Sequence, residues 1–336
     1  MHVTVVTITY AKRWDFLRQT LQSAFSEGAD RAVVIDNEAA ERIEPLAAAL
    51  FPGTVSTDRL EKNQGSAGAY HAAIQKALAA GAEYLLLLDD DNALDAGALA
   101  TLKQTYQDLL ASKSRDTLCL VAFRPDHQTE VLGGPDSNIF GKFPDAFLGF
   151  HLKELPGKIR KRLPGQAPRK SFDPSKPLPT VIARRVAPFG GLFFHRSLVE
   201  RFGLPDARLV LYQDDYEWTN RITSQGGELL LVPAARISDV ETSWSITKKP
   251  TNSFDGWLRL GSDRQVFYTV RNRSYLESHC LNPTWFRKVN RTVYIFILWI
   301  LAHAWHRMAR FQLLRRAIRD GELGQLGIHP AFPPAG

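Results

Sequence analysis

Cysteine is almost absent from this chain: its 336 residues include only two, Cys119 and Cys280. They lie far apart and match no spacing used for zinc, and two cysteines cannot build a disulfide framework. We therefore expect two buried thiols in a protein of a reducing compartment. The N-terminus also lacks a basic stretch followed by a longer apolar run. Residues 3–9 are therefore interpreted as a first strand, and no secretory signal is expected.

The C-terminal quarter lacks an apolar run long enough to cross a bilayer, which takes about 20 residues. Its run VYIFILWILA spans 293–302, inside a helical stretch predicted over Trp285–Ile318 and flanked by basic residues. Such a helix suits the interface plane of an anionic membrane. The alternative, left open here, is a helix of the core or of a dimer interface.

Negative charge is in the minority, since the formal net charge is +7 and the pI is about 9.4. This balance favours nucleic acid, phosphorylated substrates or an acidic membrane as partners. The excess is concentrated in the C-terminal helix and in a proline-rich segment, 133–180, with eight Lys/Arg against two acidic residues between His151 and Lys176. That segment is interpreted as a solvated loop or as a flap over an anionic substrate. No RNA-type motif accompanies the charge, so nucleic acid is not expected.

What the sequence does have is an alternation of strand and helix patterns. Strands are predicted at 3–9, 31–36, 83–88 and 118–123, and helices at 14–27, 41–51, 65–80 and 95–111. This order is typical of an α/β fold with a doubly wound, mostly parallel, Rossmann-like sheet. In such sheets ligands bind beyond the carboxyl ends of the strands. We therefore expect the polar residues that follow these strands to converge.

The most unusual segment is LLLLDDDN at 85–92, a fully apolar strand that ends in three carboxylates. Three adjacent charges need a cation among them or raised pKa values. Residues i and i+2 project to the same side, so Asp89 and Asp91 are expected to face one point and Asp90 another. Oxygen ligands suit Mg²⁺ or Mn²⁺. The alternative is a helix N-cap at Asp91 or Asn92, which explains only one carboxylate.

A second acidic cluster lies in LYQDDYEWTNR at 211–221. A carboxylate that faces a metal-bound phosphate site suits a general base. The alternative is that these acids open a helix and interact with its macrodipole.

Seven segments, in this order, resemble the inverting nucleotide-sugar glycosyltransferases of family GT2, which have the GT-A fold. They are VTITYAKRWDFLRQTLQS, VVIDN, KNQGSAGAYHAAI, LLLLDDDN, FGGLFFHRSLVERFGLPD, LYQDDYEWTNRITSQGG and FYTVRNRSY, between Val3 and about Tyr275. The segment NQGSAGAY, together with DDYEW and the late YxxRN pattern, resembles the galactofuranosyltransferase and rhamnosyltransferase branches.

The resemblance implies roles for the matching residues. Asp89 and Asp91 correspond to the metal ligands of the DXD element, with Asp90 nearer the ribose and Mn²⁺ or Mg²⁺ as cofactor. Asp215 corresponds to the base that deprotonates the acceptor hydroxyl. The other assignments are support of that base by Asp214 and Glu217, nucleotide-sugar contacts by Thr9, Asp36, Asn63, Gly65 and Arg271, and acceptor contacts by Gly190, Gly191, Trp218 and Trp244.

One departure from the family concerns the third metal ligand, which is often a histidine. This chain has no histidine between His195 and His279. Asp239 occupies about the right position and is the candidate ligand in its place. The alternative is a metal held by aspartates and diphosphate alone.

These assignments imply a metal-dependent enzyme that transfers a sugar from a nucleotide diphosphate sugar to a hydroxyl of a bacterial surface glycan or lipid-linked acceptor. UDP-galactofuranose is the favoured donor, and dTDP-rhamnose or another UDP-hexose is the alternative. A nucleotidyltransferase is disfavoured because TITYAKRWDF contains no glycine for a triphosphate loop. A non-enzymatic module that binds anionic membranes is the distant alternative.

The expected organisation is a transferase domain at 1–280 followed by an amphipathic helical extension at 281–336. Within the domain, residues 1–125 form the nucleotide-sugar half, 133–180 the basic loop and 181–280 the acceptor half. The expected location is the bacterial cytoplasm, on the inner face of the membrane. The sequence leaves the acceptor linkage, processivity and oligomeric state open.

Overall fold

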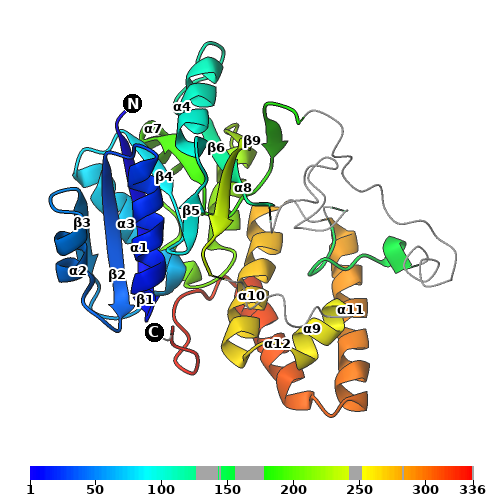
Figure 1. Ribbon diagram of the computed structural model, residues 1–336. Coiled ribbons are helices and arrows are strands. Elements are labelled where there is room, and N and C mark those ends of the chain that lie inside the picture. The colour runs from blue at the N-terminus through cyan, green and yellow to red at the C-terminus, as the bar shows by residue number, and fades with distance from the viewer. Residues whose placement is uncertain (126–142, 144, 156–177, 242–251, 282–283, 335–336) are drawn as a thin grey trace, which may run out of the picture.

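The computed structural model of the chain describes residues 1–125, 143, 145–155, 178–241, 252–281 and 284–334. These residues form a central sheet covered by helices on both faces and a second, helical region beside it (Figure 1). The α/β fold predicted from the sequence is therefore confirmed, with a helical C-terminal region.

The sheet has the strand order β3-β2-β1-β4-β8-β6-β9-β5, and β7 pairs with β9 outside this path. β1, β2, β3 and β4 run parallel, as do β6 and β9, whereas β8 lies antiparallel between β4 and β6. The strands are β1 Val3–Ala11, β2 Arg31–Ala39, β3 Val55–Arg59, β4 Tyr84–Leu87, β5 Asn92–Leu94, β6 Leu118–Phe123, β7 Ile182–Arg184, β8 Leu192–His195 and β9 Glu228–Asp239.

The helices that cover the sheet divide between its two faces. Helices α1, α2 and α4 pack into one hydrophobic core, and α3, α7 and α8 pack into the other. Their bounds are α1 Trp14–Ser26, α2 Ile43–Leu50, α3 Gly65–Ala79, α4 Ala98–Leu109, α7 Ser197–Phe202 and α8 Asp214–Ser224. Short 3₁₀ turns lie at Leu152–Glu154 and Ala207–Leu209.

β4 explains the leucine run of the sequence. Leu86 and Leu88 pack into the core under α1 and α4, while Leu85 and Leu87 pack into the core under α3 and α8. All four are fully buried. A central strand of this kind is apolar on both faces and delivers its carboxyl end to the crevice where ligands bind.

The helical region consists of α9 Ser253–Arg259, α10 Asp263–Tyr275, α11 Trp285–Ala304 and α12 Met308–Glu322, with a π-helical turn at Leu276–Cys280. One hydrophobic core joins α9 and α10 to α11 and α12, so these four helices pack as one unit. The single helix expected over Trp285–Ile318 is in fact two, because the chain breaks at 305–307, where His306 has φ 54°. In the described part of the chain, no helix is both long and apolar enough to traverse a bilayer.

Five described strands, β3, β5, β7, β8 and β9, were not among the four that the sequence predicted. β3 is a short edge strand, VSTDR, whose side chains are mostly exposed and polar, so it carries little apolar pattern. β5 follows the acidic run directly, and α4 begins only at Ala98 instead of near residue 95. The expected N-cap at Asp91 or Asn92 is therefore wrong, and Gly97 occupies the N-cap position.

Candidate active site

The acidic run forms a tight turn between β4 and β5. The Asn92 amide donates to the Asp89 carbonyl oxygen at 3.1 Å, and Asn92 Oδ1 accepts from the Asp89 amide at 3.2 Å. Asn92 is paired with Asp239 of β9 across the β5–β9 ladder. The turn therefore brings Asp239 next to the triplet, although 147 residues separate Asn92 from Asp239 along the chain.

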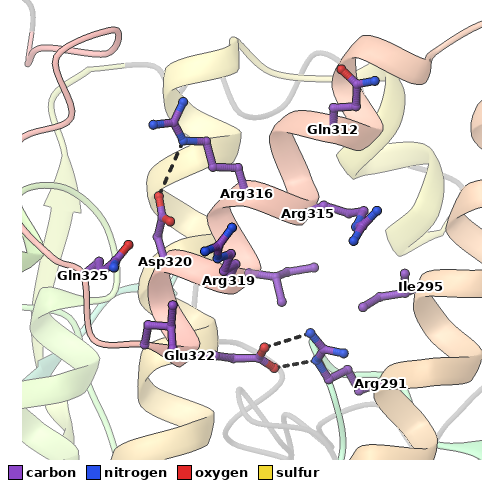
Figure 2. Close-up of a pocket in the computed structure, with 11 residues that line it drawn as sticks. Arg291, Ile295, Gln312, Arg315, Arg316, Arg319, Asp320, Glu322 and Gln325 are labelled. Atoms are coloured by element: carbon purple, nitrogen blue, oxygen red, sulfur yellow. Dashed lines mark hydrogen bonds and ion pairs between the residues drawn. The ribbon is translucent and has the colours of Figure 1, made fainter.

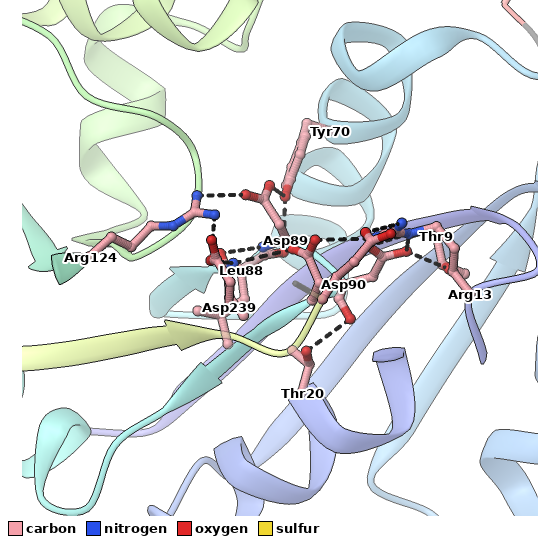
Figure 3. A network of polar contacts seen from close by, with 12 residues as sticks. Thr9, Arg13, Thr20, Tyr70, Leu88, Asp89, Asp90, Arg124 and Asp239 are labelled. Carbon is pink, nitrogen blue, oxygen red and sulfur yellow. Dashed lines mark hydrogen bonds and ion pairs between the residues drawn. The ribbon is translucent and has the colours of Figure 1, made fainter. Parts of the chain in front are cut away.

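Asp89 and Asp90 point in different directions (Figure 3). Asp90 is 5% exposed and lies toward β1, where Thr9 Oγ1 donates to its carboxylate at 2.8 Å. Burial raises the pKa of Asp90 to about 7 in spite of the neighbouring Arg13. Asp89 lies toward α3, with its Oδ1 2.9 Å from the hydroxyl of Tyr70. Asp90 is thus held in place by protein groups, whereas Asp89 is half-buried at the crevice.

Two arginines that the sequence did not single out neutralise this cluster. Arg13, just after β1, donates to both carboxylate oxygens of Asp90 at 2.9 Å, to Asp91 at 3.0 Å and to Glu241 at 2.6 Å. Arg124, just after β6, donates to Asp89 at 3.3 Å and to Asp239 at 2.6 Å. Each arginine follows the end of a predicted strand, and this position was the feature of the sequence that could have identified it as a site residue.

A divalent ion has suitable ligand atoms here. Asp89, Asp91 and Asp239 offer only carboxylate oxygens, which hard cations prefer. The pKa of Asp91 is raised by burial and by the charges of Asp89 and Asp239, a repulsion that a cation would relieve. As placed, however, no three His, Cys, Asp or Glu side chains among the described residues are arranged to hold a metal. An ion between Asp89 and Asp239 therefore requires Arg124 to move off both carboxylates.

The second acidic cluster lies in the first turn of α8. Asp214 is buried, accepts from Ser66 Oγ at 2.9 Å, and has its pKa raised by burial to about 6. Burial, and then the charge of Asp214, raise the pKa of Asp215 well above its ordinary value. The charge of Asp89 raises both pKa values as well, so the first turn of α8 lies near the triplet. Glu217 instead pairs with Arg221 on the same helix, at 2.8 Å.

The loop before α8 has an unusual backbone. Val210, Tyr212 and Gln213 have φ of 68°, 64° and 64°, values that cost non-glycine residues of order 1–3 kcal/mol each unless the surroundings enforce them. Asn272 of α10 supplies that enforcement, because its Nδ2 donates to the carbonyl oxygens of residues 209, 211 and 212 at 2.7–2.8 Å. We call residues 208–213 the catalytic loop.

Arg271 does not lie where the sequence placed it. Its side chain is 1% exposed, so direct contact with a nucleotide sugar is excluded in this conformation. The guanidinium donates to the carbonyl oxygens of Leu209 at 2.9 Å and Gly327 at 2.5 Å. Burial lowers its pKa to about 10. The sequence motif indicated that Arg271 contacts the nucleotide sugar, but in the fold its side chain positions the catalytic loop.

The C-terminal tail continues this support. The Gly327 amide donates to the Arg208 carbonyl oxygen at 2.7 Å. The hydroxyl of Tyr268 on α10 donates to the Phe332 carbonyl at 2.9 Å and accepts from the His329 amide at 3.0 Å. The segment 327–332 is thus fixed to both α10 and the catalytic loop.

Gly65 joins the catalytic loop to α3. It has φ +73°, and a Cβ there would lie 2.1 Å from the Val210 carbonyl oxygen. That oxygen accepts from the Ala67 amide, so the first turn of α3 is bonded to the loop. Asn63 is buried and accepts from the Gly65 amide at 2.9 Å, which fixes the entry to the helix.

Replacing Gly65 with alanine is expected to lower the free energy of unfolding by more than about 2 kcal/mol, from the left-handed backbone and the overpacking together. Thermal unfolding at constant pH measures it. Gly28→Ala is the matched control, since Gly28 has φ +85° but nothing within 4 Å of its added Cβ. Equal losses in the two variants would show that the contact with Val210 contributes nothing.

The glycine pair on the acceptor side borders the triplet directly. A Cβ on Gly190 would lie 2.9 Å from Asp89 Oδ2 and 2.3 Å from Asn92 Oδ1, so only glycine fits. Gly191 has φ +92° and packs against Ala122. The structure therefore brings Gly190 and Gly191 to the same point as the aspartates.

Two other predicted residues are engaged within the protein. Trp218 is fully buried, packs on Phe189 and Phe194, and donates to the Gly203 carbonyl at 2.8 Å, so its prediction as an acceptor contact is wrong. Asp36 lies in β2 and pairs with Arg59 at 2.8 Å. Trp244 and most of the basic segment 133–180 lie outside the described residues.

Comparisons with known proteins find similarity to one family. Residues 4–112 match the family model described as Glycosyl transferase family 2. The matched segment contains Thr9, Asp36 and the acidic triplet, and the resemblance to this family predicted from the motifs is confirmed.

A curated relative is similar over most of the chain. The chain is 25% identical to the galactofuranosyltransferase GlfT1 of Mycolicibacterium smegmatis over 280 residues, which are 82% of this chain and 83% of the relative.

Among solved structures, GalNAc-T7 with UDP, GalNAc and Mn²⁺ is similar, with a TM-score of 0.51 and 16% identity over 87% of this chain and 53% of that one. The chain thus spans about half the length of that protein. A TarS 1–349 structure from S. aureus in complex with UDP-GlcNAc has a TM-score of 0.45 and 12% identity, over 84% of this chain and 68% of that one.

Proposed function

We propose that the protein is an inverting glycosyltransferase that moves a sugar from a nucleotide diphosphate sugar to a hydroxyl of a glycan or glycolipid acceptor. The observation that carries the proposal is the proximity of two acidic clusters: the triplet that follows β4 and the aspartates that open α8. The similarity to a galactofuranosyltransferase over 82% of this chain supports the same reaction class.

Asp215 acts as the general base. The acceptor oxygen attacks the anomeric carbon from the face opposite the diphosphate, the new C–O bond forms as the bond to the diphosphate breaks, and the acceptor proton passes to the Asp215 carboxylate. This single displacement inverts the anomeric configuration. A raised pKa suits the role, because a base works best when its pKa lies near the operating pH.

The leaving diphosphate departs toward the triplet, where Arg13 and Arg124 carry the compensating positive charge. Asp89 and Asp91, with Asp239 as third ligand, would hold a divalent ion, Mn²⁺ or Mg²⁺, which would supply Lewis-acid stabilisation of the leaving group.

Metal-dependent donor binding tests the ligand assignment. Mutation of a residue that only hydrogen-bonds a metal ligand typically lowers metal affinity or activity 10–100-fold. We expect Asp91→Ala, which removes a ligand itself, to weaken binding of a UDP-sugar in the presence of Mn²⁺ by about tenfold or more. Calorimetric titration of the donor with and without Mn²⁺ measures it. Asp15→Ala, at a surface carboxylate that is 84% exposed, is the control. An unchanged Mn²⁺ dependence in Asp91→Ala would contradict the assignment.

UDP-galactofuranose is the proposed donor, with dTDP-rhamnose and other UDP-hexoses as alternatives. Support comes from the segment NQGSAGAY and from the curated relative. A donor screen tests this by following release of nucleoside diphosphate with Mn²⁺ across UDP- and dTDP-sugars. If no furanose or deoxy-sugar donor is turned over, the branch assignment is overturned.

The proposed location is the bacterial cytoplasm, at the inner face of the membrane. Support comes from the basic balance of the chain and from the cationic and aromatic character of α11 and α12. The proposed acceptor, a lipid-linked glycan of the cell surface, is found at that membrane face.

A further inference from the structure

A groove of about 900 Å³ runs between α11 and α12 (Figure 2). Arg291 and Ile295 line it from α11, while Arg315 and Arg319 line it from α12. A bidentate ion pair between Arg291 and Glu322, at 2.7 and 2.9 Å, crosses one side. Neither the family assignment nor the active site accounts for this groove.

The groove holds uncompensated positive charge. Four arginines and two carboxylates line it, and one carboxylate, Glu322, is engaged by Arg291. Arg315 and Arg319 make no ion pair with any carboxylate in the part of the chain that is described, and both are exposed. Guanidinium groups present a donor fork that matches phosphate oxygens.

An apolar hollow of about 510 Å³ continues from the basic end. It shares Arg291, Ile295 and Arg315 with the groove and is further lined by Phe296 and Trp299. These two aromatic rings are 58% and 41% exposed and stack on each other at 6.0 Å. Ile300 beside them is also exposed. A soluble surface rarely leaves such a patch uncovered without a partner.

The chemistry of the two hollows together is that of an amphiphile site, basic at one end and apolar at the other. We propose that the α11–α12 groove binds the phosphate of an anionic lipid in a bilayer, with Phe296, Trp299 and Ile300 inserted at the boundary of the headgroups and acyl chains. The inference rests on the proposed function, in which the acceptor is presented at a membrane, and it assigns the surface that docks there.

Charge distinguishes a bilayer from a second copy of the chain. A symmetric dimer through this face would set Arg315 and Arg319 against the same residues of the other copy or close to them, and like charges in an interface are costly. An anionic membrane instead complements the arginines and receives the aromatic side chains.

The test is vesicle sedimentation of the full chain without any donor sugar, on phosphatidylcholine vesicles with and without phosphatidylglycerol. We expect Arg315→Gln/Arg319→Gln to bind the anionic vesicles about thirtyfold more weakly, from about fivefold for each arginine near the surface. The charge-matched control is Arg31→Gln/Arg42→Gln, at exposed positions beside β2 and α2 on the opposite side of the molecule. The control is expected to retain most of the wild-type binding.

Phe296→Ser/Trp299→Ser separates the apolar contribution and is expected to weaken binding to both kinds of vesicle. Equal losses in the two arginine double variants would overturn the proposal, since net charge alone would then explain binding. So would absence of vesicle binding in the wild type, or a dimer that Phe296→Ser/Trp299→Ser dissociates while vesicle binding is unchanged. Because no donor is present, a failure of the transferase proposal leaves this result readable.

Discussion

Asp215→Asn is expected to slow sugar transfer by about 10²–10⁴-fold, the usual contribution of a general base. The amide fills the same volume at the start of α8 but takes no proton from the acceptor hydroxyl. Donor binding is expected to stay close to wild type, because the proposed nucleotide-sugar contacts lie around the end of β4 and not on α8. Single-turnover transfer and calorimetric donor binding separate the two quantities. Transfer at the wild-type rate would show that another group is the base.

Asp214→Asn is the informative partner of that variant. Since the charge of Asp214 raises the pKa of Asp215, removing it is expected to lower that pKa. Transfer requires the ionised Asp215, so the wild-type rate falls as the pH drops through its raised pKa. The acid limb of the pH–rate profile is therefore expected to move to lower pH in Asp214→Asn. A shift to higher pH would contradict the coupling.

The second large effect is expected for Asn272→Ala, although Asn272 lies on α10 and not on the catalytic loop itself. Its amide holds three carbonyl oxygens of the loop, and the loss of each such hydrogen bond costs about 0.5–1.5 kcal/mol. Without this anchor the strained backbone at 210–213 relaxes and moves Asp215. A misplacement of about 1 Å costs on the order of 10²-fold in rate. We expect kcat to fall accordingly while the KM for the donor changes little.

A buried asparagine of another helix provides the control. Asn290 of α11 is fully buried and holds backbone groups of residues 145 and 152 in the same manner. Asn290→Ala is expected to lose stability without losing kcat at temperatures where the chain stays folded. Equal effects of the two substitutions on kcat would reduce Asn272 to a structural residue.

Four of the nine described strands, β1, β2, β4 and β6, and the helices α1 to α4 follow from local pattern. The strands at 3–9, 31–36, 83–88 and 118–123 are apolar runs, and a run of this kind is visible without knowledge of its neighbours. β3 and β5 were missed because each owes its conformation to a paired strand rather than to its own composition.

The site was predictable where a strand end carries an unusual residue, as at Asp89–Asp91, and not where packing decides the role. Arg124 reaches Asp239 across 115 residues, a pairing that no spacing reveals. Trp218 and Arg271 show the converse: both stand in recognisable motifs, but their environment in the fold buries them.

The attachment of segment 327–332 to Arg208, Tyr268 and Arg271 has a practical consequence. An affinity tag fused after Gly336 would begin within a few residues of segment 327–332, which holds the catalytic loop in place. Cleavage of this segment by a protease would remove that support from the loop. The N-terminus leads into the amino end of β1, whereas the aspartates follow the carboxyl end of the neighbouring strand β4. The N-terminus is therefore the safer end for fusions and for immobilisation on a sensor surface.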